Sequence, residues 1–260
     1  MHAACLLVFV VPVSKTVVGL AVASYVVRMW AVTAGYHRYF SHRSFKTSRA
    51  FQFILAVLGT SAMQNGPIWW ASWHRRHHRF TDTPQDVHSP TQHGFWHAHM
   101  GWVLSAESEF PDTTNVPDLQ RFPELRFVDR HKWLSLIALG VTCFAIAGVP
   151  GLVWGFVLSS VLVLHATALI NSLGHVWGTR RYATKDASRN NGLLAFLTLG
   201  EGWHNNHHHA MHCARQGFRP WELDVTYYSL RFLSWIGLVW EIREPSRQTL
   251  TRSLLPRCET

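Results

Sequence analysis

Residues 51–63 read FQFILAVLGTSAM and lie between two histidine-rich segments, HRYFSH at 37–42 and HRRHH at 74–78. If this apolar stretch crossed a membrane, the two histidine groups would lie on opposite sides of it. An α-helix needs about 20 residues to cross a bilayer, and this stretch is much shorter and contains Gly59. We therefore expect an interfacial or re-entrant helix, which keeps both histidine groups on one side.

The composition of the 260-residue chain favours a membrane protein, because 48% of its residues are hydrophobic and only 15% are charged. The net charge of +9 does not indicate nucleic-acid binding, since the basic residues form no RNA- or DNA-binding motif. The four cysteines form no C-x-x-C pair, which argues against a zinc ribbon or a disulfide framework. We expect a single integral-membrane domain over residues 1–260.

The remaining apolar stretches predict an all-α protein with four transmembrane helices in two hairpins. The start of the chain lacks the basic segment of a cleaved signal, so it is interpreted as the first helix. The expected spans are 3–13, 16–36, 133–148 and 151–175. Lys and Arg concentrate in the long polar segments, which the positive-inside tendency places in the cytoplasm. These segments, 37–132 and 176–245, should form a helical cap; within it, 111–123 is expected to be a surface loop, and the tail beyond Glu244 to be loosely ordered.

Nine of the 18 histidines fall into patterns with metal-ligand spacing. Two H-x-x-H-H motifs are formed by His74, His77 and His78 and by His204, His207 and His208. Positions i, i+3 and i+4 share one face of an α-helix, so each triple can direct its imidazoles at one point. His37 and His42 would lie about 140° apart on an α-helix. We therefore expect them to serve two different metals or to flank a helix end.

A further element, NSLGH, places Asn171 and His175 one helical turn apart. The nine imidazoles are too many for one metal and would suit two metals with four or five ligands each. Imidazole binds iron, copper, zinc and nickel, so the spacing does not choose the element. Carboxylates are scarce near the motifs, which argues against a carboxylate-bridged Glu-x-x-His site. The other histidines, including His209, are interpreted as structural or solvated, although His88, His97 and His99 could support ligands from behind.

Together, HRYFSH, HRRHH, NSLGH and LGEGWHNNHH resemble the membrane-bound fatty acyl desaturases of the stearoyl-CoA Δ9-desaturase type and their bacterial relatives, over about residues 16–240. The resemblance implies four transmembrane helices, a cytosolic cap and two iron ions (Fe²⁺) that use O2 to place a cis double bond, with Δ9 favoured, in a long-chain acyl thioester. No catalytic residue beyond the metal centre is implied. The implied ligands are His37, His42, His74, His77, His78, His175, His204, His207, His208 and, through a water, Asn171.

The resemblance also implies residues around the metals. Imidazole ligands are commonly held by carboxylates, for which Glu201, Asp82 and Asp86 are candidates, the alternative being a plain surface role. Gln64, Trp70 and Thr167 occupy the positions that bend the acyl chain in the animal enzymes. Tyr25 and Met29 fall where the tunnel ends, and the bulk of Met29 predicts a chain of about 16 carbons. Alternatively, these two residues only pack helices.

The acyl carrier stays open at the level of sequence. The animal enzymes have an Arg-Asp pair that helps to hold coenzyme A where this chain has Ser72 and Trp73. Acyl-CoA is favoured on family grounds, with acyl carrier protein and phospholipid as competitors. Candidate ligands for a phosphate-bearing headgroup, which serve equally well as contacts to lipid phosphates, are Arg75, Arg76, Arg180, Arg181, Lys185 and Arg189.

The chain has no dinucleotide, flavin, haem or iron–sulfur motif, so electrons must come from a separate ferredoxin or b-type cytochrome with its NAD(P)H reductase. The expected location is a bacterial inner membrane, with the active site facing the cytoplasm. A histidine-box hydroxylase or monooxygenase acting on an alkyl or lipid substrate is the alternative enzyme. A metal transporter is disfavoured, because its ligands would lie near the bilayer midplane rather than at the helix ends.

Overall fold

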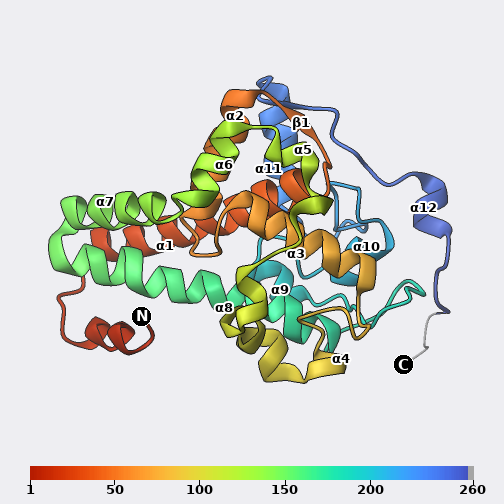
Figure 1. The fold of residues 1–260 in the computed structure, drawn as a ribbon, viewed down its shortest axis with the longest axis horizontal. Coiled ribbons are helices and arrows are strands. Elements are labelled where there is room, and N and C mark those ends of the chain that lie inside the picture. Colours follow the sequence, from red (N-terminus) through yellow and green to blue (C-terminus); the bar gives the residue numbers. More distant parts are fainter. Residues whose placement is uncertain (257–260) are drawn as a thin grey trace.

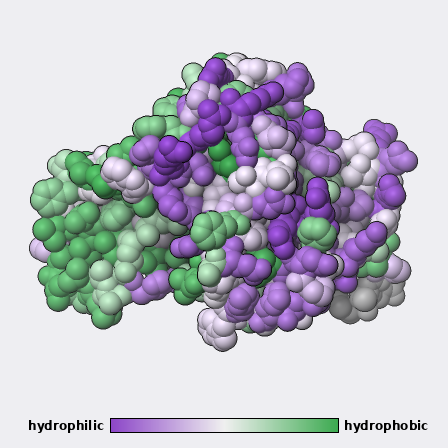
Figure 2. All heavy atoms as spheres, viewed as in Figure 1, coloured by the Kyte–Doolittle hydropathy of each residue, from purple (hydrophilic) through white to green (hydrophobic). Residues whose placement is uncertain are grey.

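The computed structural model describes residues 1–256, and nearly all of their regular structure is helical. Long helices form one end of the molecule, and short helices and loops form the other (Figure 1). The surface of the long helices is mainly hydrophobic, whereas the surface of the other end is mainly hydrophilic (Figure 2). The molecule therefore has an apolar lobe and a polar cap.

Two helical stretches in the apolar lobe are long and apolar enough to cross a membrane. The first, Lys15–Ser41, consists of α1 (Lys15–Trp30) and a π-helical segment, η2 (Ala31–Ser41). The second, Trp133–His175, folds back on itself at Ala147 and Gly148, where Gly148 has a φ of +60°. This left-handed conformation suits glycine. The expected turn between the last two long helices is present close to its expected position, and the two arms run side by side (Figure 1).

The elements of the second stretch are α7 (Trp133–Gly151), the π-helical η7 (Leu152–Leu158), α8 (Ser159–Ser172) and the 3-10 helix η8 (Leu173–His175).

The expected transmembrane helix over 3–13 is not formed. The chain instead makes a seven-residue 3-10 helix, η1 (Ala3–Phe9), that packs against η7. At about 2 Å per residue, such a helix spans only about 14 Å. Pro12 has no backbone N–H to continue it, and the side chain of Ser14 already caps α1 by accepting a bond from the backbone of Val17. Four separate transmembrane helices are thus not what the structure shows.

A buried arginine ties the apolar lobe together. Arg28 in α1 is 1% exposed, and its guanidinium donates to the Ser160 hydroxyl at 2.6 Å, to the Ser159 hydroxyl and to the Ser61 carbonyl oxygen at 3.3 Å. A cation in apolar surroundings is costly unless its donors are satisfied. These bonds therefore join α1 to α8 and to the end of α2, a connection that the sequence analysis missed.

Most of residues 51–63, the apolar stretch between the two histidine-rich segments, lies in α2 (Arg49–Thr60). The 12 residues of this helix rise only about 18 Å. It packs against η2, and Gly59 allows the ring of Tyr36 to approach so closely that a Cβ atom would lie 2.3 Å from it. The side chains of His42 and His74, which flank this helix in sequence, meet with their Nε2 atoms 2.8 Å apart. The two histidine groups therefore lie on one side, as expected.

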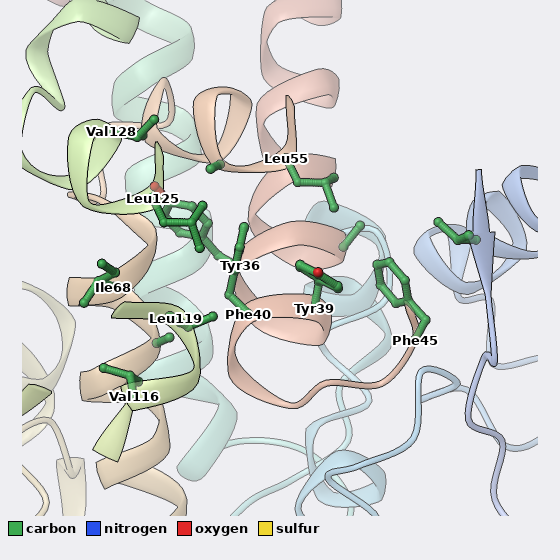
Figure 3. Close-up of a cluster of buried hydrophobic side chains, with 14 of the residues drawn as sticks. Tyr36, Tyr39, Phe40, Phe45, Leu55, Ile68, Val116, Leu119, Leu125 and Val128 are labelled. Atoms are coloured by element: carbon green, nitrogen blue, oxygen red, sulfur yellow. The ribbon is translucent and has the colours of Figure 1, made fainter. Parts of the chain in front are cut away.

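A buried apolar core holds η2 and α3 (Pro67–Phe80) in place (Figure 3). Tyr36, Phe40 and Leu55 pack there with residues of α5 (Pro117–Gln120) and α6 (Pro123–Arg130). Burial of each large apolar side chain stabilises the fold by about 1.5–3 kcal/mol. The prediction of a surface loop over 111–123 was wrong in part, because Val116 and Leu119 are fully buried in this core.

The other elements of the cap are short. A two-stranded antiparallel sheet pairs β1 (Lys46–Thr47) with β2 (Val239–Trp240). The described part of the tail that was expected to be loose forms α12 (Arg247–Thr251), and the Leu255 backbone N–H donates to the Arg181 carbonyl oxygen at 2.9 Å; residues 257–260 lie outside the described residues. The remaining helices are α4 (Pro90–His93), η3 (His97–Gly101), η4 (Trp102–Leu104), η5 (Ala106–Glu109), η6 (Thr113–Asn115), α9 (Gly192–Leu197), α10 (His204–His209) and α11 (Val225–Trp235).

Candidate metal centre

The nine motif histidines converge in two buried groups. In each group, one nitrogen atom of every residue lies within 4.8 Å of the others. The five-histidine cluster contains His37, His42, His74, His78 and His207. The four-histidine cluster contains His77, His175, His204 and His208.

His37 and His42 lie in the same cluster, contrary to the expectation that they would serve two metals, and His42 follows the last residue of η2, in agreement with the alternative of a helix end. The reason is the π-helical geometry of η2, which replaces i→i+4 hydrogen bonds by i→i+5 bonds. The backbone N–H of His42 accordingly donates to the carbonyl oxygen of His37 at 3.2 Å. Residues five apart are therefore about one turn apart here, and both imidazoles face the same point.

Each H-x-x-H-H motif is divided between the clusters, so the prediction that each triple directs its imidazoles at one point was wrong. In α3, His74 and His78 belong to the five-histidine cluster and His77 to the other. In α10 the division is reversed, with His207 in the five-histidine cluster and the remaining two in the other. The i, i+4 pair thus serves one cluster, while the i+3 residue turns toward the second.

The geometry of the five-histidine cluster fits a bound cation. Successive Nε2 atoms lie 2.8 Å apart from His42 to His74, 3.0 Å from His74 to His78, 3.0 Å from His78 to His207 and 3.0 Å from His207 to His37. An imidazole nitrogen carries either one proton or one lone pair, so it can take part in only one hydrogen bond. Three of these nitrogens have two such neighbours, and hydrogen bonds cannot account for all the contacts. A metal ion facing five lone pairs would.

The lowered pKa values of five cluster histidines also favour metal binding. Burial and neighbouring imidazoles lower the pKa of His74, His78, His204 and His207 well below the usual value. Burial lowers the pKa of His208 to about 4, although Asp186 opposes the shift. These five imidazoles are thus neutral near pH 7, the state in which imidazole coordinates metals. The Nε2 atom of His208 is buried and has no hydrogen-bond partner among residues 1–256, as a nitrogen reserved for a metal should be.

Three aspartates support the four-histidine cluster from behind. The Nδ1 atom of His77 lies 2.9 Å from Asp86, that of His175 lies 3.0 Å from Asp82, and that of His208 lies 3.1 Å from Asp186. A carboxylate that accepts the Nδ1 proton fixes the tautomer and leaves the Nε2 lone pair for a metal. Burial alone would raise the pKa of each aspartate, but the adjoining imidazoles outweigh it and hold the pKa below the usual range.

Asp186 was missed at the level of sequence, whereas the contacts of Asp82 and Asp86 agree with the supporting role considered for them. Asp186 lies 22 residues before His208, and no sequence motif links the two residues. His88 also approaches Asp86, with nitrogen and oxygen 3.3 Å apart. His209 lies in neither cluster, and its ring stacks on Tyr182 with centroids 3.8 Å apart.

The five-histidine cluster has a different support, centred on Glu201. One carboxylate oxygen of this buried residue contacts Nδ1 of His37, and the other accepts from Arg38 at 3.1 Å. Arg38 is also buried, and it pairs with Asp224 at 3.0 Å. One buried guanidinium thus lies between two carboxylates, and one of these carboxylates, Glu201, contacts the cluster through His37.

A cavity connects both clusters with the apolar lobe. It is lined by His37 and His74 of one cluster, by His77 and His204 of the other, and by Asn171 beside them. At the apolar side, its lining includes Met29 and Val32 of α1 and η2. Tyr25 packs against the same buried apolar residues, and its hydroxyl donates to the Leu197 carbonyl oxygen at 2.7 Å.

The three residues expected at the bend of the tunnel are hydrogen-bonded to one another. Trp70 Nε1 donates to Gln64 Oε1 at 3.1 Å, and Gln64 Nε2 donates to Thr167 Oγ1 at 2.8 Å. The Trp70 ring stacks on His74, with centroids 4.8 Å apart. This network joins the cavity wall directly to the five-histidine cluster.

The candidate headgroup cations are engaged to different degrees. Arg75 pairs with Asp118 at 2.7 Å and also donates to backbone carbonyls, and Arg181 pairs with Glu222. Burial would raise the pKa of Asp118, but Arg75 and Arg43 outweigh it and hold the pKa at about 2. Three others donate to backbone carbonyl oxygens: Arg76 to that of Gln85, Arg180 to those of Thr184 and Asp186, and Arg189 to that of Gly178. Lys185 has no hydrogen-bond or ion-pair partner among residues 1–256.

Apolar helices of membrane-spanning length joined to two clusters of buried imidazoles define a membrane-associated protein with a candidate two-metal centre. A sequence model described as fatty acid desaturase matches residues 14–240. The chain belongs to the fatty acid desaturase family.

Curated relatives agree with this assignment. The chain is 44% identical over 218 residues to a probable chloroplastic lipid desaturase of Arabidopsis thaliana, covering 83% of this chain and 60% of the relative. It is 39% identical to delta-9 acyl-lipid desaturase 2 of the same plant, with 87% and 74% covered. It is 37% identical to an acyl-CoA C20 Δ5-desaturase of Anemone leveillei, with 84% and 70% covered. The chain thus spans about three fifths of the first relative's length.

Proposed function

We propose that this protein is an O2-dependent fatty acyl desaturase that introduces a cis double bond into a long-chain acyl group at a pair of iron ions. The observation that carries the proposal is a cavity that touches both histidine clusters and is also lined by the apolar side chains of Met29 and Val32. A saturated acyl chain has no polar group to bind, so it requires an apolar channel that passes the oxidising centre.

The balance of the reaction defines what must be supplied. Two adjacent CH2 groups and O2 give one double bond and two waters when two electrons and two protons are added. Two further electrons come from the substrate itself. When bound, two iron ions would supply the activation of O2 and the removal of two hydrogens. The side chains of the two clusters would hold them, with His204 and His207 as neighbouring ligands of different ions.

The chain's own residues would hold the substrate and exclude water. The hydrogen bonds among Gln64, Trp70 and Thr167 fix the cavity wall beside the clusters. A fixed wall favours one carbon pair over its neighbours, because the reacting C–H bonds must lie close to the oxidant. Trp70, stacked on His74, also keeps bulk water from the five-histidine cluster. Met29, which is 1% exposed, limits the depth of the cavity.

We infer that a membrane lipid, rather than CoA, carries the acyl chain, although family grounds alone favour acyl-CoA. The Ser72 hydroxyl donates to the Asp112 carbonyl oxygen at 2.7 Å, and Trp73 donates to the Ser108 carbonyl oxygen at 3.3 Å. These positions are therefore used for internal packing. The ion pairs of Arg75 and Arg181 likewise occupy two of the candidate phosphate ligands.

Exposed apolar side chains on a chain segment that lines a neighbouring cavity support the same inference. An adjoining cavity shares Trp70, His74, Thr167 and Asn171 with the first, and is also lined by Met100 and Val103. Trp96, Leu104 and Phe110, in the same part of the chain, are 77%, 79% and 80% exposed. Exposed apolar side chains near a cavity are typical of a surface that contacts membrane. Two of the three relatives named above are also described as lipid desaturases.

The test is expression in a bacterial host, followed by mass spectrometry of the fatty acids and measurement of bound iron. A new monounsaturated acid that is absent with His207→Ala supports the proposal. A hydroxy acid would instead support a hydroxylase, and no new product together with no bound iron would contradict both. Pulse-labelled acyl groups distinguish the carriers, since lipid desaturation yields label in saturated phospholipid first and in unsaturated phospholipid later.

A further inference from the structure

Two surface hollows open beside His78. One is lined by His42 and His78 of the five-histidine cluster and by Arg43, Arg75, Arg79 and Arg243. The other is lined by His78 and by His208 of the four-histidine cluster, and by Arg79, Lys185 and Arg252. We call the surface formed by these residues the His78 face. It is the place where imidazoles from both clusters reach the lining of a surface hollow.

The His78 face has an excess of positive charge that the described protein does not neutralise. Its two carboxylates are already engaged, Asp118 by Arg43 and Arg75 and Asp186 by His208. Four of its cations are exposed and have no carboxylate partner among residues 1–256: Arg79, Lys185, Arg243 and Arg252. A concentration of unpaired charge on one face attracts a partner of opposite charge and orients it.

The position of this face argues against a role in binding lipid phosphates. The α12 helix, whose C-cap residue is Arg252, lies at the end of the molecule opposite the turn within α7 (Figure 1). That turn belongs to the hydrophobic end, whereas the cap end is mainly hydrophilic (Figure 2). A bilayer around the apolar helices would therefore leave this part of the His78 face directed at the aqueous phase.

We propose that the His78 face docks an acidic one-electron carrier protein, which reduces the metal centre through this surface. The inference rests on the proposed function, because each double bond requires two electrons from outside. A one-electron carrier must dock and leave twice per turnover, which suits a small, charged and transient interface. His78 belongs to the five-histidine cluster, lines both hollows and pairs with no carboxylate among residues 1–256, so its imidazole offers a direct protein path from this surface to that cluster.

The experiment measures carrier binding directly. The purified, iron-loaded protein in detergent is titrated with a strongly acidic [2Fe–2S] ferredoxin at low ionic strength, by calorimetry and by stopped-flow reduction. Arg243→Glu and Arg252→Glu are compared singly and together, because each lines a different hollow and neither is adjacent to a candidate ligand. The double variant should bind at least about 10-fold more weakly, and the difference should shrink at high salt.

Matched controls separate docking from a general effect of charge. Arg126→Glu/Arg130→Glu makes the same charge change on α6, away from both hollows, and should leave carrier binding within about 2-fold of the parent. Reduction by dithionite with a small viologen dye should be equally fast in all variants. Equal carrier binding by the parent and the Arg243/Arg252 variant, or an equal loss in the α6 control, would overturn the proposal. So would direct reduction by NADPH without a carrier.

The same samples distinguish failure of docking from failure of the proposed function. If the dye-reduced parent forms no double bond in any acyl substrate, the proposed function fails, whatever the carrier measurements show. If the dye-reduced parent forms product but the carrier binds equally well to the Arg243/Arg252 variant, only the docking proposal fails.

Discussion

The two histidine clusters contain the same kind of ligand but differ in what surrounds it. Three of the four imidazoles in the four-histidine cluster contact an aspartate, whereas one imidazole of the five-histidine cluster contacts a carboxylate, Glu201. The five-histidine cluster reaches two surface hollows through His42 and His78, whereas the four-histidine cluster reaches one of them, through His208. Carboxylates thus hold the imidazoles of the four-histidine cluster, whereas the five-histidine cluster is more accessible from the surface. This difference suits a division of roles in which electrons enter through the five-histidine cluster.

The clusters are nevertheless linked by shared helices. The α3 helix contributes His74 and His78 to one cluster and His77 to the other, and α10 divides its histidines in the opposite sense. A shift of either helix would change both sites together. Substitutions of single side chains are therefore the best test of how the two clusters differ.

The largest effect is expected from removing one ligand of each cluster. His74→Ala and His175→Ala should each abolish product formation and lower bound iron from about two ions per chain toward about one. Iron content by plasma mass spectrometry, with fatty acid analysis of the same cells, checks both. Retention of two irons in either variant would show that the missing imidazole is not a required ligand.

Glu201→Gln should have the next largest effect. It removes a charge that contacts both His37 and the buried Arg38, so the free energy of unfolding should fall by about 2–4 kcal/mol. Thermal unfolding of the detergent-solubilised protein measures the change. The exposed Glu107→Gln, which has no ion pair among the described residues, is the control and should shift the midpoint little. Equal stability of the two variants would contradict the role of Glu201.

Asp186→Asn should weaken the four-histidine cluster selectively. Loss of a carboxylate behind a ligating imidazole typically lowers metal affinity by about 10–100-fold. A chelator titration should therefore remove one iron at lower chelator concentration while the second stays bound as in the parent. Asp112→Asn, at a carboxylate that accepts hydrogen bonds from Thr114 alone among residues 1–256, should titrate as the parent does. Simultaneous loss of both irons would show that the clusters are not separately supported.

Met29→Ala should change chain-length preference rather than metal content. Removing this buried side chain deepens the cavity, and each methylene accommodated in an apolar pocket is worth about 1–3 kcal/mol. The product distribution should move from chains of about 16 carbons toward longer ones. Tyr25→Phe, which loses only the bond to Leu197, should keep the parent distribution. An unchanged distribution in Met29→Ala would mean that this residue only packs helices.

The smallest effect is expected for His209→Ala, next to His208 in the chain. His209 stacks on Tyr182 and contacts the Thr249 carbonyl oxygen at 2.7 Å, outside both clusters. Loss of the stacking should lower the free energy of unfolding by about 0.5–1.5 kcal/mol. Iron content and product formation should match the parent, whereas His208→Ala should lose iron. Equal iron loss in both would place His209 in the metal centre.

The sequence was sufficient for features that depend on local pattern. The apolar stretches predicted a helical membrane protein, and the repeated histidine spacing selected all nine residues that converge in the two clusters. The shortness of residues 51–63 placed both histidine groups on one side. The sequence did not reveal Asp186 or the clamp made by Arg28, because their partners are distant in the chain. The sequence analysis also overestimated the length of the first helix, which ends at Phe9, before Pro12.

Only the tertiary structure decided which histidine belongs to which cluster. Sequence spacing determines the angle between side chains around one helix, and even this angle changed when η2 became π-helical and brought His37 and His42 together. The partner of an imidazole depends instead on where the neighbouring helix lies. The packing of α3 against η2, together with the approach of His207 of α10 to His37 and His78, therefore divided each H-x-x-H-H motif between two sites, a result that no single helix contains.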